Sequence, residues 1–276
     1  MVGVDNLKAI DGPRALNYKQ DAETLHLDKG AVVFAMATFE DLRRRTRQLA
    51  ERMAKMTGVD ESTAMNVLMY AKTLTPPNNP DVIDKVVFIA QLCTRFGMSS
   101  IFLINIIFES LKLKGCAYMK LEEYVRVICV FLTTDIEVKI DFVFRCYDIQ
   151  RDGYLDFKEI YTLLTSSIIL TSEEHDTEEQ VKELIDLVMA MTDRNRDGKI
   201  TPEEFSAYVH RDILFIELLG SVLPLESFVK EFMSLLQGKT PHNVSVFFAK
   251  ERQLCLQEPP MPELGEKLYP VRLELP

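Results

Sequence analysis

Twelve residues, DRNRDGKITPEE from Asp193 to Glu204, constrain this chain more than any other stretch. Oxygen-bearing side chains occupy the first, third, fifth, ninth and twelfth places, a glycine holds the sixth, and the seventh offers its backbone carbonyl. The predicted ligands are Asp193, Asn195, Asp197, Lys199 (through its carbonyl), Thr201 and Glu204. Calcium takes roughly six to eight oxygen ligands, and a short loop can wrap it only if alternate residues point inward. The spacing therefore predicts a calcium-binding loop of the EF-hand type.

A second loop, DIQRDGYLDFKE, meets the same pattern except at its third place. Its predicted ligands are Asp148, Gln150, Asp152, Tyr154 (through its carbonyl), Asp156 and Glu159. Gln150 stands where Asp or Asn is expected, and it brings a carbonyl oxygen without a charge on a longer side chain. Two interpretations of this loop are open. It is either a working but weaker calcium site, where Mg²⁺ could also bind, or a relic that is kept only as a turn. The four remaining carboxylates favour the working site, so we expect up to two bound Ca²⁺ ions.

Amphipathic helix patterns bracket both loops, so a helix-loop-helix unit appears twice. Around the first loop the apolar positions are Ile140, Val143, Phe144, Tyr147, Ile160, Leu163, Leu164 and Ile168. Around the second they are Leu184, Val188, Met191, Phe205, Tyr208 and Val209. Leu155 and Ile200 hold the eighth places and are expected to pair in a short antiparallel bridge. The two units are therefore predicted to share one core.

An upstream loop, KLKGCAYMKLEE from Lys112 to Glu123, keeps the apolar eighth place and the acidic twelfth. Lys112 and Lys114 hold the first and third places, however, and two ammonium groups there repel a cation. This hand is predicted to be metal-free. The helices on either side of TPPNNP, residues 75–80, could form a further degenerate hand that completes a second pair.

An arginine-rich helix is predicted upstream, ending at Gly58. Its apolar seam consists of Phe39, Leu42, Thr46, Leu49, Met53 and Met56. The basic residues between them are Arg43, Arg44, Arg45, Arg47, Arg52 and Lys55. The helix could pack on its own domain, or it could dock on an acidic or helical partner.

The fold class predicted from these patterns is all-α, built from EF-hand helix-loop-helix pairs. We expect an extended arm over residues 1–30, N-terminal helices and a linker over 31–80, and an EF-hand core over 81–237. The tail over 238–276 is rich in Pro with alternating apolar residues, so an extended strap is expected there.

Composition excludes several classes of function. A net charge of −10 argues against a nucleic-acid binder. We expect no membrane span, because no apolar run reaches roughly 18 residues, and no signal peptide or myristoyl anchor, because the start MVGVDNLKAI lacks the features of either. The scattered cysteines (Cys93, Cys116, Cys129, Cys146, Cys255) are expected to be reduced thiols of a cytoplasmic protein. The histidines form no zinc set or catalytic triad, and no enzyme is predicted.

Several stretches between residues 59 and 236 resemble the calaxins, which are neuronal-calcium-sensor-like proteins of ciliary outer dynein arms. The stretches are FGM at 96–98, EY at 123–124, FRCYD at 144–148, DRNRDGKI from 193, and ILFIELLGSVLP at 213–224. The resemblance implies a calcium sensor of the axoneme that contacts the dynein arm or its docking complex, and tubulin. Lys112 and Lys114 depart from the acidic first loop of calaxins, so at most two ions are expected.

Three classes of function remain open from the sequence. The first is a sensor that switches conformation with calcium, and the second is a constitutive structural subunit of the axoneme or microtubule. The third is a calcineurin-B-like regulatory subunit of an enzyme.

Overall fold

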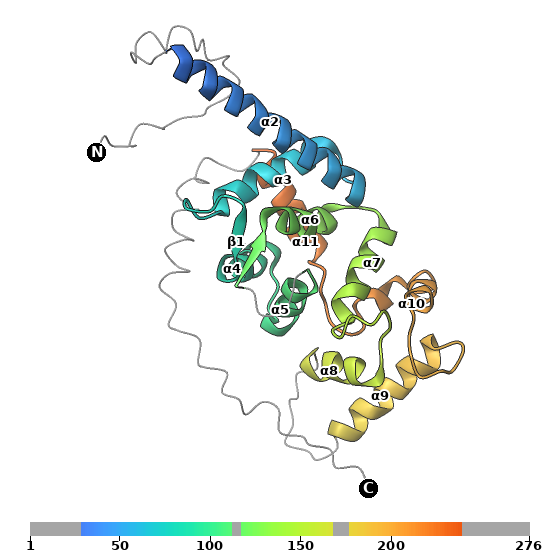
Figure 1. Cartoon of the computed structure of the whole chain (residues 1–276). Helices are drawn as coiled ribbons and strands as arrows, with labels where there is room; N and C mark the ends of the chain where they lie inside the picture. Colours follow the sequence, from blue (N-terminus) through green and yellow to red (C-terminus); the bar gives the residue numbers. More distant parts are fainter. Residues whose placement is uncertain (1–28, 112–116, 168–176, 239–276) are drawn as a thin grey trace. The chain divides into compact units, whose positions relative to one another are not determined.

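A computed structural model describes residues 29–111, 117–167 and 177–238, which are mostly helical (Figure 1). The predicted helical EF-hand fold is confirmed, with two three-residue strands added to it. The elements are α2 (Lys29–Thr57), α3 (Glu61–Leu74), β1 (Val82–Asp84), α4 (Lys85–Phe96), α5 (Ile101–Ser110), β2 (Tyr118–Lys120), α6 (Leu121–Leu132), α7 (Ile136–Tyr147), α8 (Phe157–Ser167), α9 (Thr177–Thr192), α10 (Pro202–Val209), the 3₁₀ helix η1 (Ile213–Glu217) and α11 (Glu226–Leu236). The predicted N-terminal arm up to residue 28 and the C-terminal strap from residue 239 lie outside the described residues.

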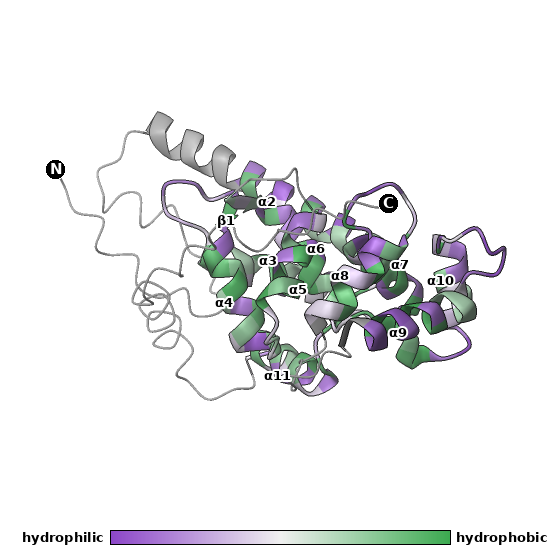
Figure 2. Ribbon diagram, turned by 90° about the horizontal axis from the view of Figure 1, so that it is seen from below, coloured by the Kyte–Doolittle hydropathy of each residue, from purple (hydrophilic) through white to green (hydrophobic). Residues whose placement is uncertain are grey.

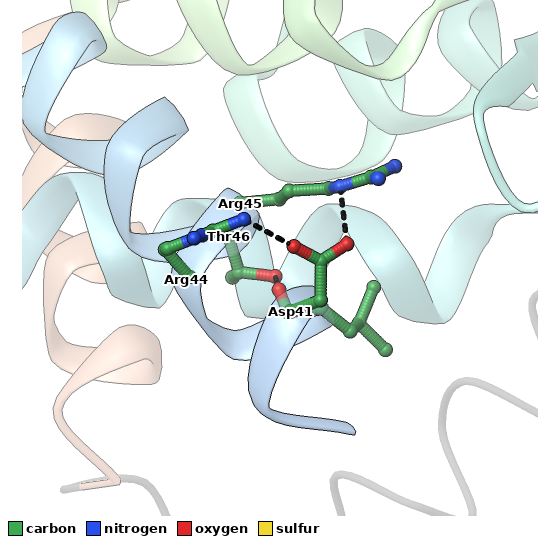
Figure 3. A network of polar contacts seen from close by, with 5 residues as sticks. Asp41, Arg44, Arg45 and Thr46 are labelled. Carbon is green, nitrogen blue, oxygen red and sulfur yellow. Dashed lines mark hydrogen bonds and ion pairs between the residues drawn. The ribbon is translucent and has the colours of Figure 1, made fainter. Parts of the chain in front are cut away.

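The chain divides into two units after Gln48, and the described part of the first unit is residues 29–48 of α2. Asp41 accepts from Arg44 Nη2 at 2.6 Å and from Arg45 Nε at 2.8 Å (Figure 3). Both arginines are mostly exposed, so each ion pair contributes at most about 1 kcal/mol. This part of α2 therefore presents guanidinium groups to solvent.

The last two turns of α2 belong to the second unit and correct the predicted seam. Ala50, Met53 and Thr57 are buried, whereas Leu42 and Met56, both predicted seam positions, are 56% and 49% exposed. The prediction gave weight to large apolar residues at heptad spacing. In the structure a small alanine and a threonine lie on either side of Met53 along the buried face instead. Thr57 satisfies its hydroxyl by donating to the carbonyl of Met53 at 2.8 Å.

The first helix-loop-helix pair consists of α3 and α4, followed by α5 and α6. Carboxylates or a hydroxyl cap three of these helices, because Asp60, Asp84 and Ser100 accept hydrogen bonds from first-turn N–H groups. β1 and β2 join the two loops in antiparallel register, with Ile83 opposite Met119. Figure 2 shows mostly hydrophobic residues on α5 and α6, in line with the many buried side chains of those helices.

The pairing of Ile83 with Met119 shows that residues 76–87, which include most of TPPNNP, are the loop of a degenerate hand. Counting from Ile83 as the eighth place, Val87 holds the twelfth and offers no side-chain oxygen. In the Lys112–Glu123 loop of the same pair, residues 112–116, including Lys112 and Lys114, lie outside the described residues. Glu123 uses its twelfth-place carboxylate to accept from the backbone N–H of Lys120 at 2.8 Å.

The second pair consists of α7 and α8, followed by α9 and α10. Most of the predicted apolar flanks are buried, including Val143, Tyr147 and Phe205. Met191 was predicted to be part of the buried stripe, but it is 42% exposed. Its helix, α9, buries Val181, Ile185, Val188 and Thr192, so the buried face runs through Thr192 rather than through Met191.

The segment that follows α10 covers apolar surface of both pairs. In η1, Phe215 packs on Tyr208 with ring centroids 4.2 Å apart, and on Phe205 at 6.1 Å. In α11, Phe232 packs on Tyr70 at 5.1 Å and on Phe96 at 4.9 Å. η1 therefore belongs to the second pair and α11 to the first.

Candidate metal-binding loops

The loop between α7 and α8 gathers three carboxylates. Asp148, Asp152 and Glu159 each offer an oxygen atom, and these atoms all lie within 4.8 Å of one another. Calcium–oxygen distances are roughly 2.3–2.6 Å, so two ligands of one ion lie at most about 5 Å apart. Among the described residues this is the one set of three acidic, His or Cys side chains that lies so close. The donor set therefore fits a hard divalent cation.

Glu159, in the first turn of α8, already faces the loop. Its carboxylate accepts from the backbone N–H of Gln150 at 2.8 Å and from that of Asp156 at 3.1 Å. Its own N–H donates to Asp156 Oδ1 at 2.9 Å, which caps the helix. Burial raises the pKa of Glu159, and the two hydrogen bonds offset part of this effect. A buried carboxylate beside other carboxylates is stabilised in its charged form when a cation joins it.

Gln150 uses its amide nitrogen within the loop in this structure. Its Nε2 donates to Asp156 Oδ2 at 3.1 Å. As a calcium ligand, Gln150 would have to present its carbonyl oxygen instead. The Gln side chain therefore holds the loop together without an ion, a role that Asp at the third place could not fill, because ionised Asp has no donor.

The backbone of the loop makes its sharp turn through left-handed residues. Arg151 has φ 63° and Gly153 has φ 89°. This turn brings the N–H groups of Asp152 and Gly153 to the Asp148 carboxylate at 3.1 and 3.0 Å. The Arg151 side chain donates to the carbonyl of Glu109 at the end of α5, which fixes the loop to the preceding hand.

The loop between α9 and α10 has the same architecture. Asp193 accepts from the N–H groups of Arg196, Asp197 and Gly198 at 2.7, 3.2 and 2.8 Å. The amide of Asn195 donates to Asp197 Oδ2 at 2.9 Å. These contacts put the predicted first-, third- and fifth-place ligands of this loop close together.

Glu204 closes this loop as Glu159 closes the other. Its carboxylate accepts from the backbone N–H groups of Arg194 and Thr201, each at 3.0 Å, and Thr201 caps α10 in return. Burial acts to raise the pKa of Glu204, but the hydrogen bonds from Thr201 and Arg194 outweigh it, so the pKa lies below its usual value. Glu204 is less buried than Glu159 and remains readily ionised.

The two loops are hydrogen-bonded to each other as predicted. Leu155 and Ile200 form an antiparallel bridge, with both N–H···O distances at 2.9 Å. Sequence reasoning missed the contact next to it, in which Lys199 Nζ lies 3.5 Å from the centroid of the Tyr154 ring. Both residues hold seventh places, beside the bridged pair, so the predicted bridge already implied that they would be neighbours.

One histidine and two cysteines of the described residues have structural roles. His210 pairs with Glu137 at 2.7 Å on the surface. Burial raises the pKa of Cys129 and that of Cys146 to about 12, as expected for buried thiols. Cys116 and Cys255 lie outside the described residues.

Comparisons with known proteins point to the same loops. The family model for an EF-hand domain pair matches residues 137–210, which contain both loops and their flanking helices. Calaxin from Xenopus laevis is 27% identical over 161 residues, which are 57% of this chain and 77% of the relative. Calaxin from Danio rerio is 26% identical over 142 residues, which are 51% of this chain and 68% of the relative.

The chain is a calaxin-like EF-hand protein. A calcineurin subunit from Schizosaccharomyces pombe is also similar, at 32% identity over 108 residues, which are 39% of this chain and 57% of the relative. None of the described helices is long and apolar enough to cross a membrane. The ligand pattern and the EF-hand pair together make this a calcium-binding protein related to calaxin.

Proposed function

We propose that this chain is a non-enzymatic, calcium-binding subunit of the ciliary axoneme, associated with the outer dynein arm or its docking complex on doublet microtubules. One observation carries the proposal: two paired loops, one of which gathers three carboxylates, lie within a chain similar to calaxins. Similarity to calaxins supports the axonemal location and the partners, and the loops support the response to calcium.

The response is proposed to begin at the twelfth-place glutamates. When bound, calcium supplies the positive charge that the gathered carboxylates lack. Glu159 and Glu204 stand in the first turns of α8 and α10, so a change at either carboxylate acts directly on its helix. Phe205 in α10 packs on Tyr147 and on Phe215, at centroid distances of 6.1 Å in both cases. A shift of α10 therefore changes the packing of η1.

The first pair is proposed to serve as a calcium-independent module. Its β1–β2 ribbon keeps the loops paired although Val87 has replaced the twelfth-place acid of one hand. α11 covers its apolar surface through Phe232, which is 2% exposed. A partner helix that used this surface would have to displace α11.

Calorimetric titration of the full chain with calcium tests the ion-binding part of the proposal. We expect two sites or fewer, with Glu204→Gln and Glu159→Gln each weakening one site by about tenfold or more, because each removes a charged ligand. Glu203→Gln is the matched control, since Glu203 is exposed beside Glu204 and holds an eleventh place outside the ligand set. Three bound ions would refute the interpretation of Lys112 and Lys114, and no bound ion would refute calcium binding altogether.

Extraction of tagged chain from isolated cilia tests the location. We expect the chain in the axonemal fraction, held there by protein contacts. Release in chelator but not in calcium would support a switching sensor, whereas retention through high salt in both would support a constitutive subunit. Absence from the axonemal fraction would overturn the proposed location.

A second candidate function is a calcineurin-B-like regulatory subunit, favoured by the similarity to the Schizosaccharomyces pombe protein. In that case, affinity capture of the full chain should recover a catalytic subunit in calcium. Recovery of dynein-arm components or tubulin without such an enzyme would decide for the axonemal proposal.

A further inference from the structure

A cation lies between the two metal-binding loops and belongs to the chain itself. The Lys199 ammonium is 3.5 Å from the centroid of the Tyr154 ring, so the side chain crosses from one loop to the other. A cation over an aromatic face at this distance is attracted by the ring quadrupole. Both residues are predicted to give calcium only their backbone carbonyls, which leaves their side chains available for this second contact.

One carboxylate of each loop also acts on the ammonium electrostatically. Hydrogen bonding to Tyr154 is the largest cause that raises the pKa of Lys199, and the charges of Asp152 and Asp197 act in the same direction. Asp152 and Asp197 hold the fifth places of their loops, so they are equivalent predicted ligands. The electrostatic influence of one positive charge therefore extends to the same position in both loops.

We propose that Lys199 is a counter-cation shared by the two loops, and that its displacement by the first calcium ion makes binding of the second ion more favourable. This inference rests on the proposed calcium binding. Calcium and the ammonium repel each other, so an ion in either loop drives the ammonium away from the carboxylates and the ring. The first ion must overcome the attraction that holds the ammonium in place. The second ion binds after the ammonium has been displaced, so its binding does not include that cost. The side chain therefore adds positive cooperativity to any coupling that passes through the Leu155–Ile200 bridge.

Lys199→Met is the direct test, because methionine keeps the backbone carbonyl and a long apolar side chain. In calorimetric titration of the full chain with calcium, we expect the first binding step to tighten by about two- to fivefold, the effect of one exposed charge, and the cooperativity to fall. Lys199→Arg should retain the cooperativity. Tyr154→Leu removes the ring that holds the ammonium and should weaken the cooperativity in part.

Lys158→Met is the matched control. Lys158 holds the eleventh place of the first loop and is exposed. Its replacement therefore removes the same charge, also within a predicted metal-binding loop. If the two Met variants tighten calcium binding equally, the effect is one of net charge and the inference is overturned. Unchanged cooperativity in Lys199→Met also overturns it. If the wild-type chain binds no calcium, the proposed function fails as well, so the two failures are distinguishable.

Chemical acetylation gives a readout that does not depend on a fitted binding model. In the wild-type full chain, mass spectrometry should show that Lys199 is modified several-fold faster with saturating calcium than with chelator, because the ammonium has left the ring and the carboxylates. Lys158 should be modified at the same rate in both. Equal rates for Lys199 in calcium and chelator would contradict the displacement.

Discussion

Gly97→Ala is expected to disturb the packing of α11 on the first helix-loop-helix pair. Gly97 ends α4 with φ 64°, a left-handed conformation that disfavours any residue with a Cβ. A Cβ at this position would also lie within 2.8 Å of three ring atoms of Phe228, which projects from α11. Phe228 must therefore move, and α11 must move with it or repack.

The expected loss of stability has two parts. The left-handed conformation costs about 1–2 kcal/mol for a residue other than glycine. Overpacking against Phe228 adds about 1–3 kcal/mol. Urea unfolding of the full chain should therefore give a loss of about 2–5 kcal/mol for Gly97→Ala, with part of it recovered if Phe228 finds another position.

Gly58→Ala is the matched control for this measurement. Gly58 also follows a helix, with φ 74°, but the nearest atom to an added Cβ is Thr133 Oγ1 at 3.4 Å. Its replacement should show the conformational part alone. In a Phe228→Ala background, the loss of unfolding free energy caused by Gly97→Ala should fall to the loss caused by Gly58→Ala. If Gly97→Ala loses the same free energy with and without the Phe228 ring, α11 does not pack on Gly97 as described and the reasoning is refuted.

Two further predictions concern buried side chains in α6 and α7. Tyr147→Phe should destabilise the chain by about 1–3 kcal/mol in urea unfolding, because the one hydrogen of the buried hydroxyl is shared between the carbonyls of Ile216 at 3.1 Å and Gly220 at 2.5 Å. Tyr118→Phe, at a residue 54% exposed, is the control and should change little. Cys129 and Cys146 should resist alkylation in the native chain at pH 8.5, because a pKa of about 12 leaves roughly one thiol in several thousand ionised. Cys93 is only half-buried and should react before these two, as followed by mass spectrometry, and faster labelling of Cys129 or Cys146 would contradict the described burial.

The loops could be predicted from the sequence because their geometry is local. Twelve consecutive residues supply every predicted ligand, and the apolar eighth place is enough to pair one loop with the other. Leu155 and Ile200 are bridged for that reason. The same eighth-place rule applies in the first pair, where Ile83 faces Met119 although neither loop sequence has the ligand pattern. The loop scaffold therefore outlasts the ion-binding side chains.

The packing of the C-terminal segment could not be predicted in the same way. Gly97 carries the ordinary sequence signal of a helix end, and nothing near it indicates that Phe228 will approach from α11. The predicted apolar seam of α2 was partly wrong for a related reason, since Ala50 and Thr57 contribute to the buried face while Met56 is exposed. Contacts between segments distant in sequence depend on which small residues allow close approach, and heptad spacing does not contain that information.

The arrangement of the C-terminal segment constrains how a partner could respond to calcium binding by this chain. Tyr147, the residue before the first ligand Asp148, holds η1 and Gly220 in place through its hydroxyl. Gly220 leads within a few residues to α11, whose Phe232 covers the first pair. One continuous stretch from η1 to α11 therefore covers both pairs, and its start is fixed beside a metal-binding loop. A partner that captures this stretch would expose the apolar surface of the first pair as well as that of the second.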